Sequence, residues 1–342
     1  MIKKIVINNI RAISNLTLDI NKNLVIITGL NGKGKSTILE AIYYISTTKS
    51  FRTKRYCEMI SFDLNFGSII IYDKKEYKVV LTKDTKKFFI NNNLTKQLDY
   101  IGNIKSIIYT KEDLKAISGS LSDRRRFFNA MISMMDEDYL KSFLEYKKFL
   151  RIRNSFLKSN KIDLKILNAY DEINSKMLYN LYTKKTKFYE KLNYYLREIN
   201  NLFNFESITI SYDIYTLDEI KANIVKTRSK DIESKTTNFG LHRENINIYI
   251  DNNIPRYYSS EGQIKTAILL IKFAVLKIYK EYGYNPIILL DDLFAELDAT
   301  RQEKVLEYLK DTQTFITSAS VADIKDYMLD DALVIDITRK EG

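Results

Sequence analysis

The order of apolar and polar positions divides the chain into three parts, and the first part predicts strands. Short apolar or alternating runs are separated by turn-forming segments such as 73–75 and 91–93. The runs that predict strands lie at 5–7, 16–18, 24–27, 68–71, 77–81 and 88–90. After 24–27 comes a glycine-containing loop and then apolar residues at helical spacing. We therefore expect a strand-rich lobe that carries one helix.

The middle part predicts long helices, because residues 120–239 contain neither Gly nor Pro. From about 163 to 203 one apolar face recurs at helical spacing, which corresponds to a helix roughly 60 Å long. Its members are Ile166, Tyr170, Ile173, Met177, Leu181, Phe188, Leu192, Tyr195 and Ile199. Leu140, Phe143, Leu144, Leu150 and Leu157 indicate an earlier partner helix, with the turn of an antiparallel hairpin at 158–161. The heptad-like pattern stops near Phe203, so a long coiled-coil arm is not expected.

The last part returns to alternating strands and helices, from 246–250 to 333–337. A length of 342 residues suggests two domains, or one large domain with a lobe attached. We predict an α/β lobe with a mixed sheet from residues 1–112 and 240–342, and an inserted helical lobe from residues 113–239.

The compartment is indicated by three features. No stretch approaches the roughly 18 to 20 apolar residues that cross a bilayer, so any membrane role would need a partner. The single cysteine, Cys57, cannot form an internal disulfide, and the N-terminal residues lead into a strand pattern without the apolar region of a signal peptide. We expect a cytoplasmic protein.

A phosphate-binding loop is the clearest chemical signal. Gly29-x4-Gly34-Lys35-Ser36 follows an apolar strand and precedes an apolar-periodic helix. The glycines let backbone N–H groups converge on an anion at the positive end of that helix, while Lys35 reaches the β and γ phosphates and Ser36 binds Mg²⁺. The candidate ATP-binding residues are Gly29, Leu30, Asn31, Gly32, Lys33, Gly34, Lys35, Ser36 and Thr37.

A carboxylate pair follows a second apolar strand far along the chain. The strand at 287–290 ends in Asp291 and Asp292, and Asp291 lies 256 positions after Lys35. Asp291 is expected to hold Mg²⁺, and Asp292 to polarise the attacking water. Seen alone, the segment could also be a buried strand with an acidic end. Together with the phosphate loop it indicates an ATPase with a large insertion.

A second anion site is indicated at the start of a later helix. A helix is expected to begin near Ile264, and the residues that open it are Ser259, Ser260, Gly262 and Gln263. They offer hydroxyl and backbone donors at the helix start. After the carboxylates come the short loop 295–298, which ends in Asp298, and the strand end 315–318.

These motifs, in this order, resemble the ATPase heads of the ABC class, and within that class the RecF family. Further segments similar to that family lie at 50–53, 121–127, 153–158 and 240–244, so the resemblance covers nearly the whole chain. It implies an ABC-type ATPase head in which two chains enclose two ATP molecules. Each ATP is then bound by the phosphate loop of one chain and by Ser260, Gly262 and Gln263 of the other. Lys35 and Asp292 are the implied catalytic residues, and Asp298 belongs to the loop after the carboxylates.

Some positions depart from the pattern of the broad class. Ser318 stands where that class has a histidine after the last core strand, and 107–112 contains no glutamine. Asp292 replaces the glutamate that transporters usually have, which fits a slow ATPase that acts as a timer. His242, the only histidine, is interpreted as structural, because no triad or metal cluster surrounds it in the sequence.

The charge points toward a phosphate-rich partner. The net charge is +11, from 54 Lys and Arg against 43 Asp and Glu, although an A- and T-rich coding sequence could supply part of the lysine excess. Residues 1–60 hold 10 basic and 3 acidic side chains, and residues 111–200 hold 19 and 12. The candidate DNA-binding residues are Lys49, Arg52, Lys54, Arg55, Arg124, Arg125 and Arg126. Each of the last three could instead form a buried ion pair or support the ATP site.

The resemblance to the RecF family implies an ATP-dependent DNA-binding protein of recombinational repair and replication. It further implies a slow, DNA-dependent ATPase that dimerises with ATP on single- and double-stranded DNA at gapped junctions. Its partners would be recombination mediators and the recombinase, at the nucleoid and without a membrane. No aromatic platform for base stacking is visible, so duplex or junction shape is the expected target rather than single strands alone. The alternatives are the ATPase subunit of a transporter and a chromosome-organising head, which would need much longer coiled-coil arms.

Overall fold

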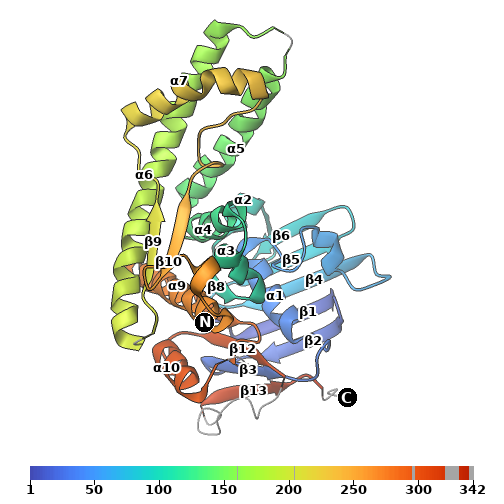
Figure 1. The fold of residues 1–342 in the computed structure, drawn as a ribbon. Helices are drawn as coiled ribbons and strands as arrows, with labels where there is room; N and C mark the ends of the chain where they lie inside the picture. Colours follow the sequence, from blue (N-terminus) through green and yellow to red (C-terminus); the bar gives the residue numbers. More distant parts are fainter. Residues whose placement is uncertain (160, 204, 295–296, 320–330, 339–342) are drawn as a thin grey trace. The chain divides into compact units, whose positions relative to one another are not determined.

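The computed structural model describes residues 1–159, 161–203, 205–294, 297–319 and 331–338, and the chain forms two compact units (Figure 1). The first unit comprises Met1–Asp113 and Tyr279–Gly342, and the second Leu114–Ile278.

An antiparallel sheet occupies much of the first unit. Its strand order is β2-β1-β4-β5-β6-β7. The strands are β1 (Lys4–Ile10), β2 (Ile13–Asp19), β4 (Phe66–Tyr72), β5 (Glu76–Thr82), β6 (Lys86–Ile90) and β7 (Asn93–Thr95). Along β5 the buried residues Tyr77, Val79 and Leu81 alternate with partly exposed ones, as expected when one face of a sheet covers a core.

A parallel sheet forms the second layer of the first unit. Its order is β13-β3-β12-β11-β8, from β3 (Leu24–Thr28), β8 (Ser106–Tyr109), β11 (Ile287–Leu290), β12 (Thr314–Ser318) and β13 (Ala332–Asp336). Helix α1 (Lys35–Thr47) contacts strands of both sheets and is buried along most of its length. The shorter elements of this unit are η1 (Tyr56–Met59), α2 (Gln97–Tyr100) and α10 (Ala299–Leu309), and η2 (Lys111–Leu114) lies at the boundary, with its last residue in the second unit.

Helices dominate the second unit. They are α3 (Lys115–Ser118), α4 (Leu121–Met135), α5 (Glu137–Leu157), α6 (Leu164–Phe203), α7 (Leu217–Ser234), α8 (Pro255–Tyr258) and α9 (Glu261–Glu281), of which α9 ends among residues of the first unit. A two-stranded antiparallel sheet pairs β9 (Ile208–Tyr212) with β10 (Ile246–Ile250). We call α5, α6 and α7 the arm, and in Figure 1 α5 and α7 lie beside α6.

The two compact units differ from the predicted lobes at one of the two boundaries. The first crossing lies between Asp113 and Leu114, one residue from the predicted one, but the chain returns after Ile278 rather than after residue 239. Because β10 pairs with β9 and contacts α4, residues 240–278 are held by the helical unit. These are long-range contacts, which local sequence patterns do not reveal.

The long helix lies where it was predicted, but two members of its predicted packing face are exposed. Leu181, Phe188, Leu192 and Ile199 are buried as expected. In the N-terminal half, however, Ile166 and Ile173 are 46% and 47% exposed. The buried positions there are Leu167, Asp171, Asn174, Ser175 and Leu178.

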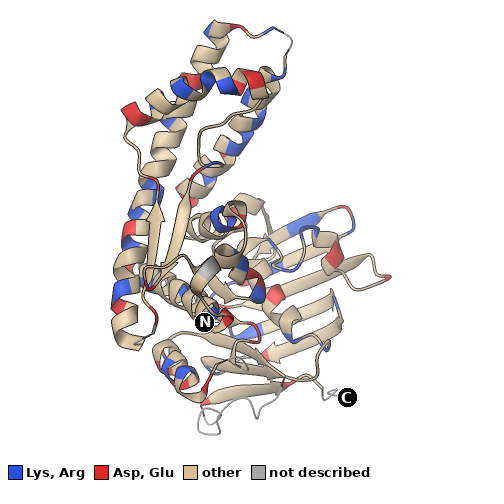
Figure 2. Cartoon of the chain, in the orientation of Figure 1, with Lys and Arg blue, Asp and Glu red and all other residues tan. Residues whose placement is uncertain are grey.

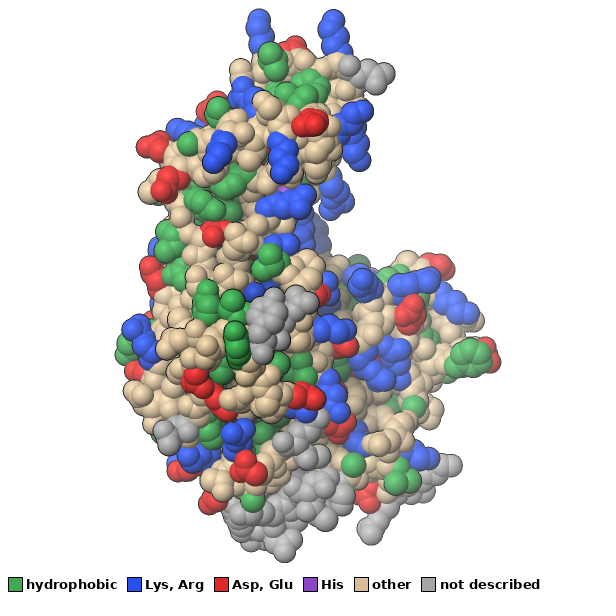
Figure 3. Space-filling model, in the orientation of Figure 1, with side chains coloured by type: hydrophobic (Ala, Val, Ile, Leu, Met, Phe, Trp, Pro, Cys, Tyr) green, Lys and Arg blue, Asp and Glu red, His purple; other side chains and the backbone are tan. Residues whose placement is uncertain are grey.

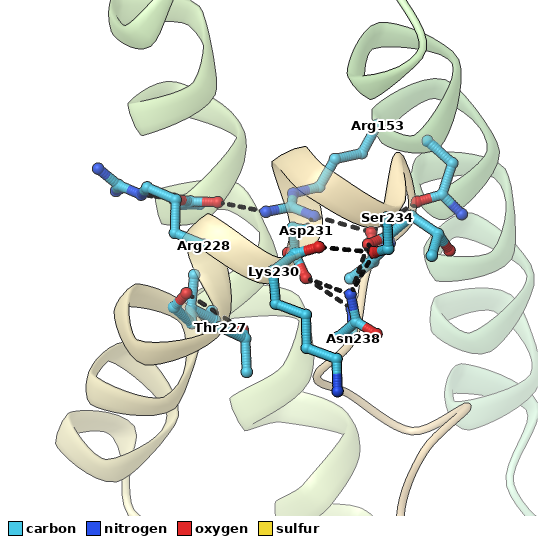
Figure 4. A network of polar contacts seen from close by, with 12 residues as sticks. Arg153, Thr227, Arg228, Lys230, Asp231, Ser234 and Asn238 are labelled. Carbon is cyan, nitrogen blue, oxygen red and sulfur yellow. Dashed lines mark hydrogen bonds and ion pairs between the residues drawn. The ribbon is translucent and has the colours of Figure 1, made fainter.

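A buried ion-pair network explains that shift (Figure 4). Arg153 of α5 is fully buried, and its guanidinium reaches Asp171 of α6 at 2.8 Å and Asp231 of α7 at 2.9 Å. It also donates to Thr237 Oγ1 at 2.8 Å, and Asp171 pairs with Arg228 at 2.7 Å. Two carboxylates thus offset two guanidinium groups, and the three arm helices are joined through polar side chains.

The predicted partner helix and hairpin are present in α5 and α6. Tyr139, Tyr146, Phe149, Arg153 and Leu157 form the buried face of α5, whereas the predicted Leu144 is 41% exposed. Asn160, in the predicted turn, lies outside the described residues. Within the described part of the chain, no helix combines the length and apolar character needed to span a bilayer.

Candidate nucleotide-binding site

The phosphate loop connects β3 to α1. Gly29 and Gly34 adopt φ angles of 145° and 107°, which L side chains rarely adopt. A Cβ at Gly29 would lie 2.9 Å from Ile337 Cγ1, and one at Gly34 would lie 3.0 Å from Ile13 Cγ1. Both positions favour glycine for their backbone conformation, and at Gly29 a side chain would also require Ile337 to move. Leu30, Asn31, Gly32 and Lys33 lie exposed along the loop between them.

The start of α1 fits an anion. Gly34 caps the helix without a side-chain hydrogen bond. Within the described residues no protein acceptor binds the backbone N–H groups of Gly34, Lys35 or Ser36, whereas the N–H of Thr37 donates to Gly34 O at 2.9 Å. Unsatisfied N–H groups and the positive end of the helix dipole favour a phosphate.

Lys35 lies over this loop. Its side chain is buried, and Nζ donates to Gly29 O at 2.6 Å and to Asn31 Oδ1 at 3.3 Å. Both acceptors are neutral loop oxygens. A phosphate oxygen would bind the ammonium more strongly than either acceptor, because a charge-assisted hydrogen bond exceeds a bond to a neutral acceptor.

The carboxylate pair is fixed by a threonine that sequence reasoning did not identify. Thr317, at the end of β12, is fully buried; its Oγ1 donates to Asp291 Oδ1 at 2.9 Å and accepts from the N–H of Asp292 at 2.9 Å. Asp292 itself has a φ of 53°, in the left-handed region. The only sequence signal was that Thr317 directly precedes Ser318, in the strand end singled out for the missing histidine.

The topology brings the two motifs to one edge. In the parallel sheet β12 lies between β3 and β11, so the carboxyl ends of all three strands share an edge. Neighbouring strands are about 4.8 Å apart, so the ends of β3 and β11 lie about 10 Å apart. Ser36 and Asp291 supply oxygen ligands of the kind that Mg²⁺ prefers. Among the described residues no group of three or more His, Cys, Asp or Glu forms a separate metal cluster.

The basic candidates of the first unit lie just after α1. Lys49, Lys54 and Arg55 are exposed, and Arg55 pairs with Glu58 at 3.8 Å. Arg52 is also exposed, yet its Nη1 lies 3.6 Å from Glu40 Oε2.

Glu40 joins these residues to α1. Its carboxylate is completely buried, receives a hydrogen bond from the Ser50 hydroxyl and pairs with Arg11 at 3.0 Å. The segment that carries Arg52 is thus bonded directly to the helix of the phosphate loop.

The three consecutive arginines of α4 have different surroundings. Arg124 donates to the carbonyl oxygens of Ala116, Ile117 and Ile246, at 2.8, 3.2 and 2.7 Å. Arg125 donates to Glu244 O at 2.9 Å, and exposed Arg126 pairs with Asp123 at 3.1 Å. Arg124 and Arg125 therefore join α4 to neighbouring backbone, while Arg126 lies at the surface.

The second predicted anion site begins α9. The N–H of Ser260 donates to Gln263 Oε1 at 2.9 Å, and the N–H of Gln263 donates to Ser260 Oγ at 3.3 Å, which is a capping box. A Cβ at Gly262 would meet only Ser260 Oγ, at 3.9 Å. Nothing described in its own chain requires glycine there.

Asp298 occupies another helix start. Its Oδ1 accepts from the N–H of Arg301 at 3.0 Å and so caps α10. Residues 295 and 296 of the same predicted loop lie outside the described residues.

His242 packs in the second unit. Its Nε2 donates to Thr237 O at 2.8 Å, and the Tyr146 hydroxyl lies 3.4 Å from Nδ1. Burial lowers the pKa of His242 from its ordinary value. Nearby, the buried pair Lys185 and Glu244 have a lowered and a raised pKa respectively, because both groups are desolvated. These contacts agree with a structural role for the histidine.

A phosphate loop and a carboxylate strand on one parallel sheet, with a long helical insertion between them, define a P-loop ATPase of the ABC type. The chain matches the RecF/RecN/SMC N terminal domain family over residues 1–338. A solved Smc head domain from Pyrococcus furiosus, with TM-score 0.57 and 15% identity over 98% of this chain and 92% of that one, has the same fold. The predicted fold class, an ABC-type ATPase head, is confirmed.

Within that class the chain belongs to the RecF family. It is 34% identical to the DNA replication and repair protein RecF of Clostridium perfringens (strain SM101 / Type A), over 96% of this chain and 95% of the relative. It is 33% identical to RecF of Clostridium tetani, over 99% and 98%. The solved structure of the recombination mediator protein RecF-ATP in the RecFOR pathway superposes with TM-score 0.87 and 29% identity, over 95% of each chain.

Proposed function

We propose that this chain is an ATP-dependent DNA-binding protein of recombinational repair and replication, which dimerises on gapped DNA and leaves it after ATP hydrolysis. The observation that carries the proposal is the edge of the parallel sheet where the uncapped start of α1 and the Thr317-held carboxylates lie two strands apart. Near full-length similarity to RecF proteins supports the biological role.

At the phosphate loop, the N–H groups of residues 34–36 bind phosphate oxygens. Lys35 Nζ exchanges Gly29 O and Asn31 Oδ1 for oxygens of the β and γ phosphates. The Ser36 hydroxyl and Asp291, oriented by Thr317, would hold Mg²⁺, which neutralises developing charge on the phosphates. Asp292 orients and polarises the attacking water. Asp292, in place of the glutamate that transporters usually have, fits slow turnover, as in a timer.

The dimer rests on the start of α9. Ser260, Gly262 and Gln263 offer donors at a helix N-terminus to the nucleotide bound by a second copy of the chain. The space around Gly262 supports this role, since its own chain leaves the position open. ATP then acts as the link between two copies, and its hydrolysis separates them.

DNA is the proposed partner because the chain carries a net charge of +11 and exposes Lys49, Arg52, Lys54, Arg55 and Arg126. Single- and double-stranded DNA at gapped junctions, other recombination mediators and the recombinase complete the proposed set of partners. The proposed location is the cytoplasm, at the nucleoid.

ATPase activity and sedimentation, measured together with and without gapped DNA, test this proposal. The wild type should dimerise with ATP and hydrolyse it slowly, and DNA should raise the rate. Lys35→Ala should lose both nucleotide binding and dimerisation. Asp292→Asn should bind ATP and stay on DNA as a dimer. A wild-type chain that remains a monomer with ATP and ignores DNA would overturn the proposal.

A further inference from the structure

The part of the arm with the largest excess of basic over acidic residues is α5 with the turn after it. Residues 146–162 contain six Lys and Arg and neither Asp nor Glu. Figure 2 shows Lys and Arg along α5, and in Figure 3 their side chains project from the α5 side of the arm.

The exposed basic residues of α5 lie on one side of the helix, away from its buried face. Residues turn by 100° along a helix, so Lys148, Arg151, Ser155 and Lys158 fall within an arc of about 80°. That arc is opposite the buried residues Tyr146, Phe149, Arg153 and Leu157. Lys148, Arg151 and Lys158 are all exposed, so this side of the helix is a basic face.

The three basic side chains have no acidic partner within the described residues. Other arm cations do have one: Lys141 pairs with Glu137 at 2.6 Å, Lys176 with Glu172 at 2.8 Å and Lys184 with Asp136 at 2.9 Å. Unlike these, the face formed by Lys148, Arg151 and Lys158 presents net positive charge to whatever approaches it.

The opposite side of α5 is rigidly held. Arg153 is bonded to Asp171, Asp231 and Thr237, and Asn154 Oδ1 accepts from Thr237 N and Oγ1 at 2.9 and 2.7 Å. The basic face is therefore presented by a helix that is fixed to α6 and α7. A partner that binds it gains the charge interaction without ordering the backbone.

We propose that the basic face of α5, formed by Lys148, Arg151 and Lys158, binds the phosphate backbone of duplex DNA. This inference rests on the proposed DNA-binding function and places part of it on the arm. From Lys148 to Lys158 the helix rises about 15 Å, which matches about four base pairs of duplex. Among the exposed residues of α5 none is aromatic, so the face can contact phosphates but cannot stack on unpaired bases.

The three arginines of α4, which the sequence indicated as DNA-binding candidates, already have partners in the chain, and this favours the basic face of α5. Arg124 and Arg125 use their guanidinium groups on backbone carbonyl oxygens, and Arg126 pairs with Asp123. In the second unit the basic face of α5 is thus better placed than the α4 arginines to neutralise a polyanion.

The salt dependence of duplex binding tests the proposal. A labelled duplex is titrated with the full-length protein, ATP and Mg²⁺ at several salt concentrations, and the logarithm of the binding constant is plotted against that of salt. In the triple variant Lys148→Ala, Arg151→Ala, Lys158→Ala the slope should become shallower by about 3, or about 1 for each lost phosphate contact. Lys148→Arg with Lys158→Arg should keep the wild-type slope.

The chain offers a matched control on the neighbouring helix. Lys176→Ala, Lys187→Ala, Arg197→Ala removes the same charge from exposed positions of α6 and should shift the slope by less than about 1. Circular dichroism of both triple variants should match the wild type, since only surface side chains change.

The outcomes separate the two proposals. If the duplex-binding constant of the wild type falls steeply with salt and the α5 variant has the same slope, the basic face is not a DNA site, while the proposed function stands. If the wild type with ATP binds no DNA, both proposals fail. A loss confined to single-stranded DNA would overturn the assignment to duplex.

Discussion

Two buried charged side chains of the second unit, Arg153 and Lys185, are each paired with polar groups. Arg153 meets two carboxylates and a hydroxyl, and Lys185 meets Glu244 and the Asn129 side chain. Isolated, each ion would lose far more hydration than packing returns. Together they are tolerated, and they restrict how the helices can pack.

The lone histidine allows a direct test at this scale. Burial holds the pKa of His242 below its ordinary value of 6.5, so the ring is neutral at pH 7 and Nε2–H can donate to Thr237 O. Because the chain has one histidine, a single pair of imidazole C–H signals reports its titration by NMR. The midpoint should lie below about 6.5. A midpoint at or above that value would contradict the burial of the ring.

The same shift has a consequence for stability. As pH falls through about 6.5, the unfolded chain takes up the proton before the folded chain does. The contribution of His242 is therefore complete above that pH and is lost as pH falls toward the folded pKa. His242→Asn should show a smaller loss of unfolding free energy between pH 7.5 and 5.5 than the wild type does, by urea denaturation.

At the scale of elements, α6 shows how a packing face can depart from the apolar pattern. Its C-terminal half buries residues that the apolar pattern predicts, whereas the buried face of its N-terminal half includes Asp171 and Asn174. This shift of the buried face leaves Ile166 and Ile173 about half exposed. The ion pairs of Asp171 with Arg153 and Arg228 decide the orientation, because leaving Asp171 buried and unpaired would cost about 3 to 5 kcal/mol.

Two alanine substitutions on α6 distinguish the two orientations. Leu178→Ala empties a fully buried position and should lower the free energy of unfolding by about 2 to 5 kcal/mol. Ile173→Ala, on the face that the sequence pattern favoured, should change it by no more than about 0.5 kcal/mol. Chemical denaturation of both variants gives the comparison. Equal losses would place Ile173 in the core after all.

These elements also show what the sequence could predict. The six early strands, the long helix and the phosphate loop follow from local patterns, because each depends on neighbours within a few positions. Thr317 and the inward polar face of α6 do not, because their partners Asp291 and Arg153 lie 26 and 18 positions away. A pattern of apolar residues carries no information about which buried polar group will find a counterpart.

At the scale of the whole molecule, the chain leaves the first unit after Asp113 and returns after Ile278. The three strands whose carboxyl ends share the edge of the nucleotide site belong to the first unit, while Ser260, Gly262 and Gln263 belong to the second. The order of the motifs was readable from the sequence. The boundary at Ile278 was not, because it is set by the pairing of β9 with β10 and by contacts of α4.

If ATP links two copies, thermal stability should depend on protein concentration only when ATP is present. Binding to the folded state alone stabilises by mass action, by about 2.7 kcal/mol at a hundred times Kd. Tm measured over a hundredfold range of protein concentration should rise with Mg-ATP and stay constant without it. Lys35→Ala should abolish both the shift and its concentration dependence. A shift that is independent of concentration would indicate nucleotide binding to single copies.

If ATP links two copies, the capping box at the start of α9 sets a free-energy cost that the nucleotide must offset before it binds there. The backbone N–H of Ser260 donates to Gln263 Oε1 and that of Gln263 donates to Ser260 Oγ, so these two backbone donors reach an incoming phosphate only when the box opens. A cap of this kind stabilises a helix by about 1 kcal/mol, and an approaching nucleotide must offer more than that to replace it. A loosely held ligand would leave the box closed. In the proposed dimer, a nucleotide already fixed on the opposite copy would compete best for these donors, which would guard the chain against premature pairing.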